Sequence, residues 1–224
     1  MSTPQEALRM LRAPDQRHQG RAAEPDVGEV TAEHLAAIEA FAVTVRAWNP
    51  SLVPGPVQTT RYAAGAIRTT APAIPPSEVQ RRAHQRAARA DQFLTRWSTG
   101  AVNEAVFVIG ERALTQPLVH ADAHRAQLRQ LLAVSVLPNV HVHVVPEGRA
   151  VPGRLGQMSV YALEPTAHGG GNGVRVGYLE TPVGGWYTTR TEDIARLHGA
   201  FAEIIGAALD LDGTRAFLTE VLIR

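Results

Sequence analysis

The spacing of the apolar residues changes near residue 105, and this change constrains the fold more than any other feature of the sequence. Before it, apolar residues such as Leu35 and Ile38 recur every three or four positions, as in amphipathic helices. After it, the run 105–109 (AVFVI) is wholly apolar, and the run 140–145 (VHVHVV) alternates with a period of two, as strands do. Helices followed by strands predict an α+β domain.

The ends of the helices are indicated by capping residues and prolines. Thr31, Ser77, Asp122 and Thr191 stand at positions typical of helix N-caps. The expected helices span 31–48, 59–68, 77–97, 122–132, 191–205 and 213–223. The expected strands span 105–109, 140–145, 157–164 and 174–180, and the last two form an antiparallel hairpin around the loop 168–173 (HGGGNG).

We therefore expect N-terminal helices, then a small, mixed and mostly antiparallel four-stranded sheet, then C-terminal helices. Residues 1–29 are polar and contain several Pro, Arg and Gly residues, so they are interpreted as an arm or linker with a short helix over 5–12. Residues 30–224 are expected to form a single α+β domain of a ligand-binding type.

The composition excludes several classes of function. The 22 basic and 21 acidic residues nearly balance, which does not favour broad binding to nucleic acid. Because the chain has no Cys, disulfides, thiolate metal sites and Cys nucleophiles are excluded. We find no secretory signal and no stretch of about 18 apolar residues that could span a membrane. A cytoplasmic location is therefore expected.

Histidines form two candidate metal motifs. His120 and His124 are four apart in HADAH, and His141 and His143 share one face of a strand. For the first pair, a solvated helix N-terminus competes with a metal site. For the second pair, a polar face at a cavity or solvent edge is favoured over a metal. The loop 168–173 lacks the features of a phosphate loop. Neither a metal nor a cofactor is expected.

Two glutamates directly follow apolar strands. Glu111 ends the strand around 105–109, and Glu180 ends the strand that contains Tyr178. A carboxylate at the end of a strand can face a cleft and act as a general acid or base. It can equally pair with nearby arginines, including Arg86 and Arg89. Both interpretations remain open.

The segment 52–63 (LVPGPVQTTRYA) places a rigid Pro-Gly-Pro turn before a polar helix start that contains Gln58 and Tyr62. This segment resembles the VPGLLQT-x-x-YA signature of a domain of unknown function (5753). Further similarities follow in sequence order and cover roughly residues 30–222. They comprise Glu39, Arg86 with Arg89, VFVIGERAL (106–114), AQLRQLL (126–132), VHVHVVP (140–146) and GYLE (177–180).

The resemblance implies a ligand or partner domain of actinobacterial Xre-family, antitoxin-like regulators, here without the helix-turn-helix module. Direct DNA binding is therefore not expected. One hypothesis is that the signature segment lines a small-molecule pocket together with the Arg-bearing helix and the strand-end glutamates. The alternative is that it locks the fold: Thr caps the helix, Gln58 binds turn carbonyls and Tyr62 packs in the core.

Two functions follow. The first is a cofactor-independent acid/base enzyme of a natural-product pathway, which would condense or cyclise a small aromatic or amino-containing metabolite, as in a Pictet–Spengler closure. Its candidate catalytic residues are Glu180 and Glu111, and its candidate substrate-binding residues are Gln58, Tyr62, Arg86, Arg89, His143 and Tyr178. The alternative is a non-catalytic effector-binding or antitoxin-like protein that acts through a small protein partner. A homodimer is compatible with either function.

Overall fold

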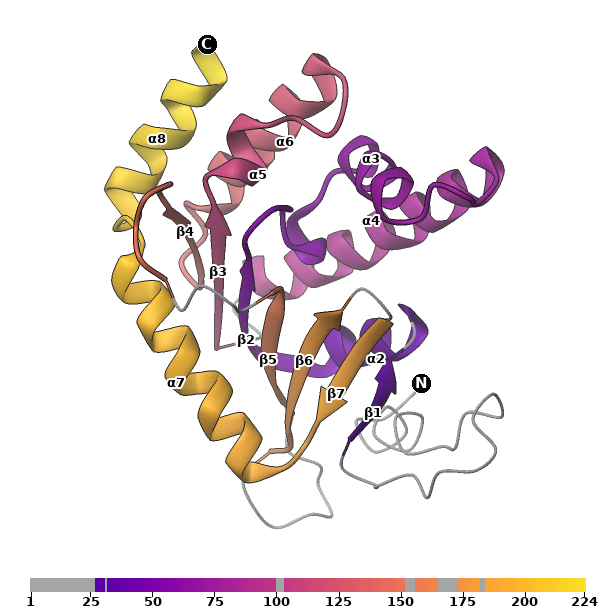
Figure 1. The fold of residues 1–224 in the computed structure, drawn as a ribbon, viewed down its shortest axis with the longest axis vertical. Coiled ribbons are helices and arrows are strands. Elements are labelled where there is room, and N and C mark those ends of the chain that lie inside the picture. Colours follow the sequence, from indigo (N-terminus) through magenta and orange to yellow (C-terminus); the bar gives the residue numbers. More distant parts are fainter. Residues whose placement is uncertain (1–26, 31, 100–102, 152–155, 165–172, 182–183) are drawn as a thin grey trace.

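The structure is a computed structural model that describes residues 27–30, 32–99, 103–151, 156–164, 173–181 and 184–224. Its strands form one seven-stranded sheet in the order β1-β7-β6-β5-β2-β3-β4. Figure 1 shows this sheet in the middle, with α7 and α8 along one side of the view and α3 and α4 along the other.

Strands and helices are interspersed along the described part of the chain. The strands are β1 (Val27–Val30), β2 (Ala42–Asn49), β3 (Glu104–Gly110), β4 (Val140–Val145), β5 (Met158–Leu163), β6 (Arg175–Thr181) and β7 (Gly184–Thr188). The helices are α2 (Ala32–Phe41), the 3-10 turn η1 (Gly55–Val57), α3 (Thr60–Thr70), α4 (Pro76–Ser98), α5 (Arg112–Thr115), α6 (Ala121–Val134), α7 (Thr191–Ala207) and α8 (Leu211–Ile223).

The expected four-stranded sheet is wrong, although the α+β class agrees with the structure. The four expected strands correspond to β3, β4, β5 and β6, and β1, β2 and β7 were missed. The pairs β2–β3 and β3–β4 are parallel, and the other four pairs are antiparallel. The expected boundary between arm and domain, at residue 29, falls within β1.

The most consequential correction concerns the expected helix 31–48. The helix α2 ends at Phe41, and β2 begins at Ala42 and becomes a central strand between β3 and β5. Its β-branched run Val43–Val45 favours strand, because branching at Cβ restricts side-chain rotamers in a helix. The strands β3 and β5, which are distant from β2 in sequence, then pair with β2 on both edges and fix its strand conformation.

Three expected N-caps are also corrected. The helix α4 follows Pro75 rather than Ser77, because proline at the first helical position presets the backbone. The helix α6 is capped at His120, and Asp122 lies in its first turn, where an acid is favourable. The helix α7 follows Arg190 rather than Thr191. The expected helix 5–12 and most of the hairpin loop lie outside the described residues.

The two faces of the sheet bury separate clusters. One face packs against α2, α4, α6 and α8 through residues that include Ile38, Trp97, Phe107, Leu131 and Leu218. The other face packs against α7 through residues that include Trp48, Val108, Val160, Phe201 and Ile204. The first of these faces, which α2 and α4 cover, also contains a polar cavity.

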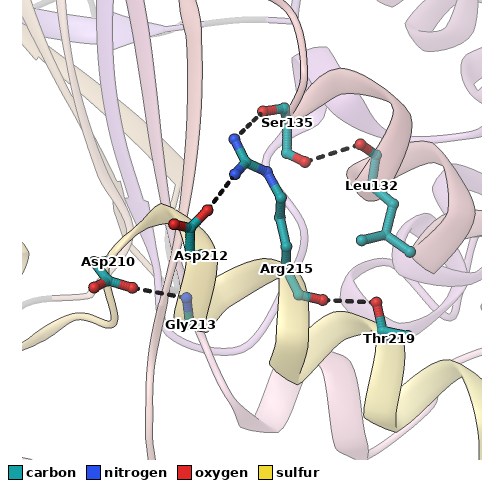
Figure 2. Close-up of polar contacts among 7 residues, drawn as sticks. All are labelled: Leu132, Ser135, Asp210, Asp212, Gly213, Arg215 and Thr219. Atoms are coloured by element: carbon teal, nitrogen blue, oxygen red, sulfur yellow. Dashed lines mark hydrogen bonds and ion pairs between the residues drawn. The ribbon is translucent and has the colours of Figure 1, made fainter.

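The start of α8 is fixed to the end of α6 by polar contacts, drawn in Figure 2. Asp210 caps α8 by accepting a hydrogen bond from the Gly213 N–H at 2.7 Å. The Arg215 guanidinium donates to Asp212 at 2.7 Å and to the Ser135 carbonyl at 3.3 Å. Since Ser135 is the C-cap of α6, Arg215 satisfies a carbonyl that has no partner within the helix.

Helices long and apolar enough to cross a membrane do not occur in the described ranges.

Candidate functional site

A cavity of about 360 Å3 lies on the sheet face that α2, η1 and α4 cover. The strand register explains which side chains reach it. Ser159 on β5 lies opposite Tyr178 on β6 and opposite Ala47 on β2, so the three residues share one face. Because side chains alternate along a strand, the residues two positions further on point to the same face. They are Asn49, Tyr161 and Glu180, and all three line the cavity.

The helical side of the cavity carries opposite charges. Arg86 and Arg89 are three residues apart on α4, so they lie on one face of that helix. Glu39 comes from α2, and Gln58 follows η1. Five of the predicted site residues therefore line one recess, although they come from separate elements: Gln58, Arg86, Arg89, Tyr178 and Glu180.

Arg86 is oriented by the signature segment. Its Nη1 donates to Gln58 Oε1 at 3.2 Å, and Gln58 Nε2 donates to the Val53 carbonyl at 2.6 Å. Burial and the charge of Arg89 lower the pKa of Arg86, whereas Glu39 and Glu180 oppose this effect. The guanidinium is intrinsically so basic that it remains a cation at neutral pH. The recess therefore contains a fixed, half-buried positive charge.

Glu39 is the most buried carboxyl group of the cavity and was missed as a site residue. Only 7% of it is exposed, and burial raises its pKa, while Arg89 and Arg86 act in the opposite direction. Glu39 stands four residues after Leu35, so it lies on the apolar side of its helix. A glutamate among the apolar positions of a helix is the sequence signal that could have identified Glu39 as a site residue.

Replacing Glu39 with Gln is expected to change how stability depends on pH. Because the folded state favours the protonated carboxyl, Glu39 contributes stability below its usual pKa of about 4.5 and loses it as pH rises through the raised folded value. The unfolding free energy of the wild type minus that of Glu39→Gln should therefore fall as pH rises above about 4.5. Urea titrations of both proteins at several pH values measure it, and a flat difference contradicts the expectation.

Tyr178 and Glu180 form a direct pair at the other side of the cavity. The Tyr178 hydroxyl donates a hydrogen bond to Glu180 Oε2. Burial and this bond raise the pKa of Tyr178, and burial and the Glu39 charge raise that of Tyr161. Both phenols therefore remain hydrogen-bond donors. A Cβ atom on Gly185 would lie 2.6 Å from the Tyr178 ring, so this glycine makes room for the ring.

Tyr62 does not line the cavity. Its side chain is fully buried, and its hydroxyl accepts a hydrogen bond from the Val53 N–H at 3.1 Å. Thr59 caps α3 by accepting from the Tyr62 N–H at 3.4 Å. The fold-locking interpretation therefore describes Thr59 and Tyr62. Gln58 has both roles, because it binds the turn carbonyl of Val53 and also lines the cavity beside Arg86.

Glu111 and His143 also lie outside the cavity. Glu111 Oε2 accepts a hydrogen bond from the Glu147 N–H at 2.8 Å, which ties the end of β3 to the loop after β4. His143 Nδ1 lies 2.8 Å from the Leu209 carbonyl oxygen, so it links β4 to the connection between α7 and α8. Both contacts are structural.

His120 and His124 lie in different environments. His124 is buried against the Leu114 carbonyl at 2.7 Å, whereas His120 is exposed at the start of α6. Among the residues that the structure describes, no three His, Cys, Asp or Glu side chains come together as metal ligands do.

The fold and the cavity define an α+β domain with one polar recess between its sheet and its N-terminal helices. The chain belongs to the family described as "Domain of unknown function (DUF5753)", which matches residues 32–220. Searches of curated proteins and of solved structures found no match.

Proposed function

We propose that the cavity binds a small aromatic or amino-containing metabolite. The observation that carries this proposal is the convergence of two guanidinium, two carboxyl and two phenol groups from α2, α4, β5 and β6 on one recess. A concave site with a few convergent polar groups is typical of small-molecule binding. On this proposal, Arg86 holds an acidic group of the ligand, and the Tyr178–Glu180 pair holds its amine.

We further propose that the chain acts on this ligand as a cofactor-independent acid/base enzyme. A Pictet–Spengler type of closure suits the groups present. Amine and aldehyde condense with loss of water, the aromatic ring attacks the resulting iminium carbon, and a base removes the displaced ring proton. Glu180 is the proposed base, and Glu39, with its raised pKa, supplies a second carboxyl for proton transfer. Glu111 has no part in this proposal, because it lies outside the cavity.

A non-catalytic effector site is the second candidate, and the internal pairing of the cavity favours it. Gln58 binds Arg86, and Tyr178 binds Glu180, so a ligand could exchange these bonds and thereby shift the helices against the sheet. As an effector-binding protein, the chain would be related to Xre-family, antitoxin-like regulators. It would then act in the cytoplasm through a protein partner.

A turnover experiment in metabolite extract separates the two. Purified protein is added far below stoichiometric amounts to extract from source cells that lack its gene, and mass spectrometry follows all ions over time. Glu180→Gln serves as the test variant, and Glu192→Gln, an exposed position on α7, is the matched control.

We expect an ion that is consumed many times over by the wild type and by Glu192→Gln, but not by Glu180→Gln. An ion that is retained in a one-to-one ratio without turnover supports the effector site instead. The cavity proposal is wrong when no ion is either consumed or retained.

A further inference from the structure

A second, wider cavity of about 830 Å3 lies along α3, and all charged residues that line it are basic. It shares no lining residue with the first cavity. Its walls come from α3, α4, the segment 117–120 and the start of α6. We call this second cavity the basic groove. The groups that give it its character are Arg61, Arg68, His84 and His120.

Helical spacing places the two arginines on one side of α3. Arg61 and Arg68 are seven residues apart, which is two turns or about 10 Å along the axis. Between them lie Ala64 and Gly65, whose small size leaves a shallow floor. A Cβ atom at Gly65 would collide with Val119, so the segment 117–120 rests directly on the backbone of α3.

The charges of this groove are not compensated by carboxylates. Neither the Arg61 side chain nor the Arg68 side chain has a hydrogen bond or ion pair with another residue of the described ranges. In contrast, Arg81 and Arg82 on α4 both bind Glu78. The carboxylate nearest to His120 is that of Asp122, 4.0 Å from His120 Nδ1, and it already accepts from Arg125 at 2.6 Å.

The position of Arg61 increases this excess of positive charge. Arg61 lies in the first turn of α3, a turn without any acidic residue. A cation is unfavourable there, because the amino end of a helix carries partial positive charge. Helix stability therefore does not explain Arg61. An anion in the groove would relieve the repulsion and bind to two guanidinium groups that have no competing partner.

We propose that the basic groove binds a small organic phosphate, with Arg61 and Arg68 holding the phosphate group. Guanidinium groups match phosphate oxygens in a bidentate geometry. The organic part of the ligand lies against Leu118 and Val119, two half-exposed apolar residues that form the facing wall. This site is independent of the function proposed for the first cavity.

The proposal is tested by calorimetric titration with phenyl phosphate and with inorganic phosphate at constant ionic strength. We expect saturable binding of phenyl phosphate that weakens at least tenfold in the double variant Arg61→Gln/Arg68→Gln. The double variant Arg112→Gln/Arg196→Gln removes the same two charges at exposed positions outside the groove and should bind as the wild type does.

Circular dichroism confirms that each variant is folded, and the single variants Arg61→Gln and Arg68→Gln replace the double variant when it is not. Heats that do not saturate overturn the phosphate site. Equal affinity in the wild type and in the Arg61 and Arg68 variants overturns it as well. Equal affinity for phenyl phosphate and inorganic phosphate overturns the role of the apolar wall.

Discussion

Replacing Gln127 with Leu is expected to lower the free energy of unfolding by about 2 to 6 kcal/mol, because it leaves one buried and one partly buried backbone group without partners. Gln127 is completely buried in α6. Its Oε1 accepts from the Thr59 N–H at 2.7 Å, and its Nε2 donates to the Val57 carbonyl at 2.8 Å. Leucine has a similar size but can satisfy neither group. A loss of this size is a large part of the stability of a typical domain.

Gln130→Leu is the matched control for this prediction. Gln130 is half-exposed on the same helix, and its side chain makes no hydrogen bond within the described residues. The same exchange should therefore change stability by less than about 0.5 kcal/mol. Urea unfolding followed by far-ultraviolet circular dichroism measures both variants against the wild type. Equal stability of the two variants would show that the Gln127 hydrogen bonds do not hold the signature segment in place.

The second large effect is expected for Arg86→Met, which should weaken binding of whatever ligand the wild type retains from extract by at least about 30-fold, or about 2 kcal/mol. Methionine keeps the aliphatic part of the side chain and removes the guanidinium. The change takes away a cation that lowers the pKa of Glu39, so that pKa should rise further. Carbon-detected NMR titration of the Glu39 carboxyl measures this rise without any ligand.

Arg82→Met, one turn earlier on α4, is the control for this prediction. Arg82 is exposed and pairs with Glu78, so the same substitution should leave both ligand retention and the Glu39 titration unchanged. The charge argument fails if Arg86→Met leaves the pKa of Glu39 where it is in the wild type. The binding argument fails if Arg86→Met retains the ligand as the wild type does.

These two predictions are connected through the signature segment. Gln127 fixes the backbone on both sides of Gln58, at Val57 and at Thr59. Gln58 in turn accepts a hydrogen bond from Arg86. A residue of α6 that does not touch the first cavity thus positions a guanidinium inside it. Gln127→Leu should therefore also weaken ligand retention, but less than Arg86→Met does.

The sequence by itself determined the elements whose signals are local. The run 140–145 alternates with a period of two and is strand β4. Thr59 or Thr60 was expected to cap the helix through about residue 68, and Thr59 is the cap of α3. The signature segment, with its ordered matches along the chain, indicated the family. The end of a strand marked Glu180 as a candidate, and the family resemblance marked Arg86 with Arg89; all three line the cavity.

Only the tertiary structure decided the rest, because the deciding contacts join residues distant in sequence. β2 is a strand because β3 and β5 pair with it from both sides, although its apolar spacing also fits a helix. Tyr62 belongs to the core because Val53 and the packing around it enclose its ring. Glu39 reaches the cavity because α2 lies across the sheet near α4. Local sequence patterns do not specify these long-range contacts, because the sheet register and the docking of the helices determine them.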